Sequence, residues 1–157
     1  MPMKKAGFLL LLLLWMLPAS PVQAQKILLG ERIPEVRNVT WLDELHPEPA
    51  PLTAVVFFTA ANPSCLKALT HLRQLMERSG DRLRIIVVTR DEAGQAAETL
   101  GELLSSRLTV ALDPEGKIFK SFGVNYVPFS LLTDARKRVL WQGNSLQLTE
   151  QILATAQ

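Results

Sequence analysis

The part of this sequence most able to do chemistry is one cysteine and the three residues before it. Cys65 follows Asn62, Pro63 and Ser64, a run typical of a helix start, because an Asn side chain caps a helix and a proline suits its first position. Cys65 therefore falls in the first helical turn. The partial positive charge of a helix N-terminus lowers the pKa of a thiol, whereas apolar burial raises it and leaves the thiol inert. The sequence leaves both outcomes open.

Cys65 is the only cysteine of the chain, so no disulfide can form within it. A leftover cysteine in an oxidising compartment is a candidate reactive or intermolecular thiol. The alternative is a small buried hydrophobe, which is how most free cysteines behave. The histidines His46 and His71 are isolated, and six residues separate His71 from Cys65, which puts it on a different helix face. We interpret both histidines as surface residues and expect neither a metal site nor a cofactor.

Buried strands alternate with helices along the chain. Leu52–Thr59 and Leu83–Thr89 are unbroken apolar runs rich in β-branched residues, as expected for strands buried on both faces. The predicted strands are 52–59, 83–89, 108–112, 129–133 and 139–142, and the predicted helices run from Pro63 to Gly80, over 92–106, briefly over 118–122, and over 146–156. This order predicts an α/β fold: a central, mostly parallel sheet with an antiparallel C-terminal hairpin and helices on both faces.

The N-terminal residues predict export. Lys4 and Lys5 precede an apolar run and Pro18, and small residues up to Ala24 offer a cleavage site, so residues 1–24 are predicted to be a signal peptide. The run is too short to span a membrane, and we expect no stable membrane anchor after cleavage. Residues 25–51 are predicted to form an irregular, proline-rich and solvent-exposed lead-in, in which residues 36–45 make a short strand and a turn of helix against the domain. Residues 52–157 form one domain. The predicted location is periplasmic or secreted.

The mature chain is nearly neutral, so its charge gives no reason to expect a nucleic-acid partner. Without Lys4 and Lys5, the chain has 15 basic and 15 acidic side chains, so the basic isoelectric point comes from the predicted signal peptide. The basic run 136–138 fills a predicted hairpin turn and is interpreted as solvated. Trp41 and Trp141 are interpreted as packing residues.

Residues 55–65, an apolar strand followed by Thr59-Ala60-Ala61-Asn62-Pro63-Ser64-Cys65, resemble the strand and active-site turn of exported thioredoxin-like proteins. The resemblance is to thiol-disulfide oxidoreductases of the TlpA/ResA type (redoxin/AhpC-TSA-like). It continues through the segments 112–116, 122–124, 127–132 and Asp134, in that order, and spans roughly residues 30–154. It implies a thioredoxin-like fold, extracytoplasmic thiol chemistry and a proline, here Pro128, that is cis and faces the active-site turn.

Four positions depart from the family pattern. Asn62 stands where the attacking cysteine belongs, and Ala61, Ala68 and Val56 replace a tryptophan, a glutamate and a polar strand residue. A dithiol cycle needs one thiolate to attack and a second to resolve the mixed disulfide. Only the resolving position survives, as Cys65, in a degenerate N-P-S-C motif. We therefore expect no normal thioredoxin cycle and, at most, a monothiol exchange protein.

Two function hypotheses follow. In the first, Cys65 acts in extracytoplasmic thiol redox or protein-folding biology, by a mixed disulfide with a protein or peptide partner. In the second, the protein is a redox-inactive module that binds an extended peptide or a partner's edge strand beside Pro63, Ser64, Val127 and Pro128, by strand-like backbone pairing. A peroxiredoxin-like peroxidase fits worst, because Asn62 and Phe58 stand where that family has threonine and proline.

Overall fold

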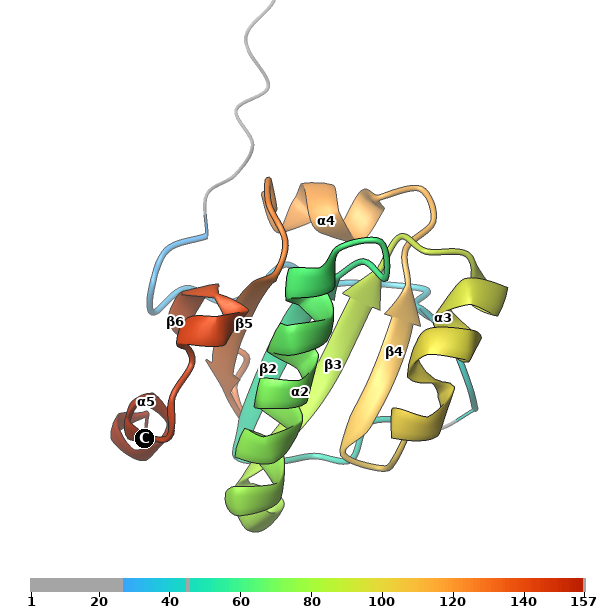
Figure 1. Cartoon of the computed structure of the whole chain (residues 1–157). Coiled ribbons are helices and arrows are strands. Elements are labelled where there is room, and N and C mark those ends of the chain that lie inside the picture. The colour runs from blue at the N-terminus through green and yellow to red at the C-terminus, as the bar shows by residue number, and fades with distance from the viewer. Residues whose placement is uncertain (1–26, 45, 157) are drawn as a thin grey trace, which may run out of the picture.

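The structure, a computed structural model, describes residues 27–44 and 46–156, so the predicted signal peptide lies outside the described residues. Its centre is one sheet in the order β1-β4-β3-β2-β5-β6 (Figure 1). The strands are β1 (Thr40–Trp41), β2 (Leu52–Phe58), β3 (Leu83–Thr89), β4 (Leu108–Leu112), β5 (Phe129–Asp134) and β6 (Val139–Asn144). The pairs β2–β3 and β3–β4 are parallel, and β5–β6 is the predicted antiparallel hairpin. Since β2–β5 and β1–β4 are also antiparallel, the sheet is mixed, with a parallel centre.

Four α-helices among the described residues accompany the sheet. They are α2 (Pro63–Arg78), α3 (Ala93–Leu100), α4 (Lys117–Ser121) and α5 (Glu150–Thr155), and short 3-10 turns cover Gly80–Arg82, Gly101–Leu103 and Ser145–Gln147. Two helices are shorter than predicted. A 3-10 turn follows α3 directly, and α5 begins only after Thr149, whose hydroxyl accepts the Ile152 N–H at 3.3 Å. Leucine spacing alone therefore overestimated both lengths, because turns and caps set the ends.

Each face of the sheet has its own hydrophobic core. On one face, α2, α3 and α5 pack through Leu72, Leu100 and Leu153 against alternate strand residues such as Val56 and Ile85. Figure 1 shows α2 and α3 lying in front of the sheet. The other face is covered by α4 and by the lead-in. Helices on both faces were predicted, but the second face has only the five residues of α4.

The lead-in is not merely a solvent-exposed connection, because it packs on the core and pairs with the sheet. Ile27 is buried, Trp41 packs on the second core, and β1 pairs with β4 at the sheet edge. The short strand expected in this segment is thus present. The turn of helix also expected there does not occur among the described residues. None of the described helices is long and apolar enough to cross a membrane.

Candidate functional site at the start of helix α2

The start of α2 lies at the edge of the sheet where the parallel strands end. The Oδ1 atom of Asn62 accepts the backbone N–H of Ser64 at 2.9 Å, and the backbone carbonyl of Asn62 accepts the Cys65 N–H at 2.9 Å. Pro63 occupies the first turn, where no intrahelical partner for its nitrogen is needed. The predicted helix start is therefore confirmed, with Asn62 as its cap.

The same asparagine reaches a second chain segment. Its Nδ2 atom donates a hydrogen bond of 3.2 Å to the carbonyl of Val127. The Val127–Pro128 peptide bond is cis, as the resemblance implied. Position 62 and the loop before β5, which are 65 residues apart in the sequence, are thus brought into direct contact. Pro128 itself is buried, whereas Val127 is half-buried.

Cys65 faces the core and not the solvent. The residue is only 1% exposed and belongs to the same apolar cluster as Leu69 and Phe58. Burial raises the pKa of the thiol, the negative charge of Asp91 raises it further, and a hydrogen bond with the backbone of Thr59 acts in the opposite direction. The helix N-terminus therefore does not produce an exposed, acidic thiol at this position.

Asp91 is a site residue that the sequence reasoning missed. It follows β3, and its two carboxylate oxygens accept the Thr59 hydroxyl at 2.9 Å and the Ala60 N–H at 2.8 Å. These bonds fix the turn between β2 and α2. A signal was available, because polar residues that directly follow neighbouring parallel strands meet at one sheet edge.

A surface hollow lies beside the cis proline. It has a volume of about 380 Å³ and is lined by Phe58, Thr59, Arg90, Phe119, Val124, Asn125, Tyr126 and Val127; we call it the cis-proline groove. Tyr126 is 53% exposed, and its ring stands edge-on to Phe129 at a centroid distance of 5.3 Å. Among the described residues, no hydrogen-bond acceptor faces the Val127 N–H. The groove therefore combines aromatic walls, one cation and a free backbone donor.

The structure separates the predicted site residues into two groups. Asn62 and Val127 touch, and Val127 lines the cis-proline groove. Pro63 and Ser64 are exposed at the start of α2 but do not line the groove, and Cys65 lies behind them in the core. Cys65 does not line the groove itself, but Thr59, whose backbone is hydrogen-bonded with the thiol, does.

Two residues set aside in the sequence analysis have structural roles. His71 is half-buried, and its Nε2 lies 2.6 Å from the carbonyl of Leu148, so it links α2 to the C-terminal segment and is less exposed than predicted. His46 is exposed. No group of three or more potential metal ligands is found in the described part of the chain.

No protein-family model matches the chain, and no curated protein matches its sequence. Solved structures do match. A protein assigned as the thiol:disulfide interchange protein DsbE of Chlorobium tepidum is 20% identical, with a TM-score of 0.66 over 83% of this chain and 99% of that one. A thiol peroxidase from Chromobacterium violaceum is 17% identical, with a TM-score of 0.63 over 83% and 85%. The exposed lipoprotein thioredoxin of Streptococcus pneumoniae strain TIGR4 is 19% identical, with a TM-score of 0.53 over 69% and 84%. This chain therefore has a thioredoxin-like α/β fold.

Proposed function

We propose that this protein works outside the cytoplasm as a thioredoxin-like binding module with a degenerate active site. Its cis-proline groove holds an extended segment of a partner protein or peptide, and Cys65 takes no part in that binding. Export is supported by the signal-peptide pattern of residues 1–24 and by the surface location named for the pneumococcal neighbour. No metal or organic cofactor is required for such a function.

The observation that carries the proposal is the backbone N–H of Val127, a groove residue, which has no hydrogen-bond acceptor among the described residues. A partly buried donor without a partner is unfavourable, and the carbonyl of an extended peptide would satisfy it. The Val127 carbonyl already accepts Asn62 Nδ2, which leaves it a second lone pair for a peptide N–H. Backbone pairing of this kind supplies affinity, and the flanking pockets supply selectivity.

The lining of the groove suggests which segments would fit. Tyr126 and Phe119 provide aromatic surface, and Arg90 is an exposed cation with no ion-pair partner among the described residues. An extended segment that carries an apolar residue next to an acidic one matches this lining. Exposed aromatic and arginine side chains are also the residue types that contribute most to binding in protein interfaces.

Monothiol exchange through Cys65 is the second candidate. It is favoured by the place of Cys65 in the first turn of α2 and by its hydrogen bond with the backbone of Thr59, which stabilises a thiolate. The step would be attack of the Cys65 thiolate on a disulfide, which forms a mixed disulfide and releases one thiolate. The burial and raised pKa of the thiol make this step slow in the folded protein.

One pair of probes separates the two candidates. Reduced and carboxymethylated α-lactalbumin is unfolded and has neither thiols nor disulfides, so it can bind only non-covalently. We expect saturable shifts of the Tyr126 and Val127 amide signals in an NMR titration of the mature protein. Incubation with oxidised glutathione should leave the intact mass unchanged. A glutathione adduct that is absent from Cys65→Ser would instead support monothiol exchange.

Matched variants locate the binding surface. Tyr126→Ser should weaken binding of the unfolded probe about fivefold to tenfold, because exposed aromatic anchors contribute strongly to binding. Leu29→Ser removes an exposed apolar side chain from the lead-in, outside the groove, and should leave the affinity unchanged. Equal losses in both variants, or shifts remote from Val127, would contradict the proposal.

A further inference from the structure

The face of the sheet opposite α2 is incompletely covered. α4 has five residues, which make a helix of only about 7 Å, and the extended lead-in covers the rest. An extended chain directs about half of its side chains away from the surface it crosses. The result is a cavity of about 270 Å³ between the lead-in and the sheet, which we call the strap cavity.

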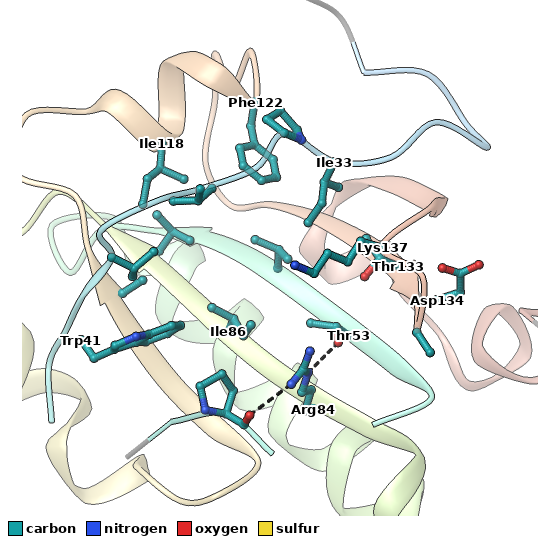
Figure 2. Close-up of a pocket in the computed structure, with 18 residues that line it drawn as sticks. Ile33, Trp41, Thr53, Arg84, Ile86, Ile118, Phe122, Thr133, Asp134 and Lys137 are labelled. Atoms are coloured by element: carbon teal, nitrogen blue, oxygen red, sulfur yellow. Dashed lines mark hydrogen bonds between the residues drawn. The ribbon is translucent and has the colours of Figure 1, made fainter. Parts of the chain in front are cut away.

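The strap cavity has an apolar part and a polar end, as Figure 2 shows. Its apolar walls come from β2, β3 and β4, from α4 and the residue after it, and from the lead-in: Ile33, Pro34, Val36, Val39, Trp41, Val55, Ile86, Val88, Ala111, Ile118 and Phe122. Trp41 is thus both the packing residue that was predicted and a wall of this cavity. The polar end is formed by Pro47, Thr53, Arg84, Thr133, Asp134, Ala135 and Lys137.

Arg84 at the polar end has only neutral partners. Its Nε donates to the Thr53 hydroxyl at 2.7 Å, and its Nη1 donates to the carbonyls of Pro47 and Glu48 at 3.3 and 2.7 Å. No carboxylate pairs with it among the described residues. Its guanidinium is partly desolvated, and this burial lowers its pKa. A desolvated charge without a counter-ion is unfavourable, so an anion bound nearby would stabilise it.

A second cation faces the same space. Lys137 comes from the turn between β5 and β6, and Figure 2 shows its side chain extending into the cavity. Asp134 is the only acidic residue in the lining. Its Oδ1 already accepts the backbone N–H groups of Arg136 and Arg138 at 2.8 and 2.9 Å, and Figure 2 shows the carboxylate on the outer side. Arg84 and Lys137 therefore leave a net positive charge at this end.

We propose that the strap cavity binds a small amphipathic anion, namely a medium-chain carboxylate whose alkyl chain lies between the lead-in and the sheet and whose carboxylate lies between Arg84 and Lys137. An engineered cavity of about 150 Å³ holds the six carbons of benzene, so 270 Å³ suits roughly ten to twelve non-hydrogen atoms. Nη2 of Arg84 has no partner among the described residues, so it can donate a charge-assisted hydrogen bond to the carboxylate. This ligand site is independent of the cis-proline groove.

Decanoate, below its micellar concentration, is the direct probe. We expect saturable binding to the mature protein with a Kd on the order of 0.1 mM, with shifts of the Ile86 and Val88 amides and of the Trp41 indole in an NMR titration. Methyl decanoate has the same chain without the charge and should bind at least about tenfold more weakly. Equal affinity for the ester would overturn the assignment of the carboxylate, and no saturable binding would overturn the site.

Two variants test the two parts of the cavity. Ala111→Leu adds three carbons to the apolar part and should abolish decanoate binding. Lys137→Asn removes one cation while keeping the left-handed backbone of that residue (φ 64°), which asparagine tolerates; it should weaken binding about threefold to tenfold, since the lysine is exposed and screened. Arg136→Gln, from the same turn but outside the lining, is the control. Unchanged binding in both test variants, or equal weakening in the control, would show adsorption elsewhere.

Discussion

The side-chain amide of Asn62 joins helix α2 to the cis-proline loop, since Nδ2 donates to the Val127 carbonyl at 3.2 Å while Oδ1 caps the helix at Ser64. A cysteine at this position could make neither bond with comparable strength, because a thiol is a weak donor and acceptor. Asn62 therefore has a structural role, because it caps α2 and ties this helix to the cis-proline loop.

Replacing Asn62 tests the two halves of this bridge separately. Asn62→Ala removes both bonds and should lower the free energy of unfolding by about 1–2 kcal/mol, since a lost N-cap alone costs about 1 kcal/mol. Asn62→Asp keeps the oxygen that accepts the Ser64 N–H but loses the donor to Val127. It should therefore lie between the wild type and Asn62→Ala in urea unfolding. An unfolding curve of Asn62→Asp identical to that of the wild type would show that the bond to Val127 contributes nothing.

Asn62→Cys should create a dithiol site with Cys65. Residues three apart on a helix have Cβ atoms about 5–6 Å apart, and a small rotation of the first turn allows a disulfide. With oxidised glutathione, the introduced thiolate forms a mixed disulfide and releases glutathione; Cys65 then attacks it and releases a second glutathione. Intact mass should show the loss of two hydrogens and no adduct.

The matched control is Asn62→Cys in a Cys65→Ser background. Without the resolving thiol, the glutathione adduct should accumulate. Should the adduct also accumulate when Cys65 is present, the buried thiol does not reach position 62, and the prediction is wrong.

Much of the fold was predictable because strong local signals agree with the tertiary structure. The strand Leu83–Thr89 was predicted to the residue, and the start of α2 followed from Asn62 and Pro63 alone. Unbroken apolar runs leave little choice but a buried strand, and a cap next to a proline fixes a helix start. The predicted C-terminal end of α3 and the predicted start of α5 were wrong. A 3-10 turn at Gly101 ends α3, and Thr149 caps α5, and both depend on local geometry that periodicity does not encode.

The candidate site was predictable only in part. The cis bond before Pro128 came from the resemblance, and the contact of Asn62 with Val127 joins segments that no local pattern connects. The burial of Cys65 was one of two open outcomes, because the sequence does not show whether the first turn of a helix faces solvent or core. The strap cavity was not predicted, since it results from how the lead-in crosses the sheet.

The raised pKa of Cys65 predicts how stability changes at alkaline pH. The folded-state pKa lies above the ordinary value, so the folded protein keeps the thiol proton that the unfolded chain loses. The Cys65 thiol therefore contributes fully to the stability of the folded protein at pH values below the thiol pKa of the unfolded chain. This contribution is lost as the pH rises from there through the thiol pKa of the folded protein. Cys65→Ala should therefore lose less stability than the wild type between neutral pH and pH ~10. Parallel Tm profiles for the two proteins would contradict the raised pKa.

Asp91→Asn should make the Cys65 thiol more acidic. The carboxylate of Asp91 raises the pKa of the thiol, although burial contributes more. Asparagine can still accept the Thr59 hydroxyl or the Ala60 N–H through its one oxygen, so the turn is kept at the cost of one hydrogen bond. The pH midpoint of alkylation by iodoacetamide should therefore shift downward.

The test needs a control, because a looser turn would also speed alkylation. Loosening raises the rate at all pH values, whereas loss of the Asp91 charge moves the midpoint. Thr59→Val removes the hydroxyl that Asp91 accepts at 2.9 Å but keeps the carboxylate, and it should raise the rate without moving the midpoint downward. A downward shift in Thr59→Val equal to that in Asp91→Asn would show that solvent access, and not the charge of Asp91, sets the reactivity of Cys65.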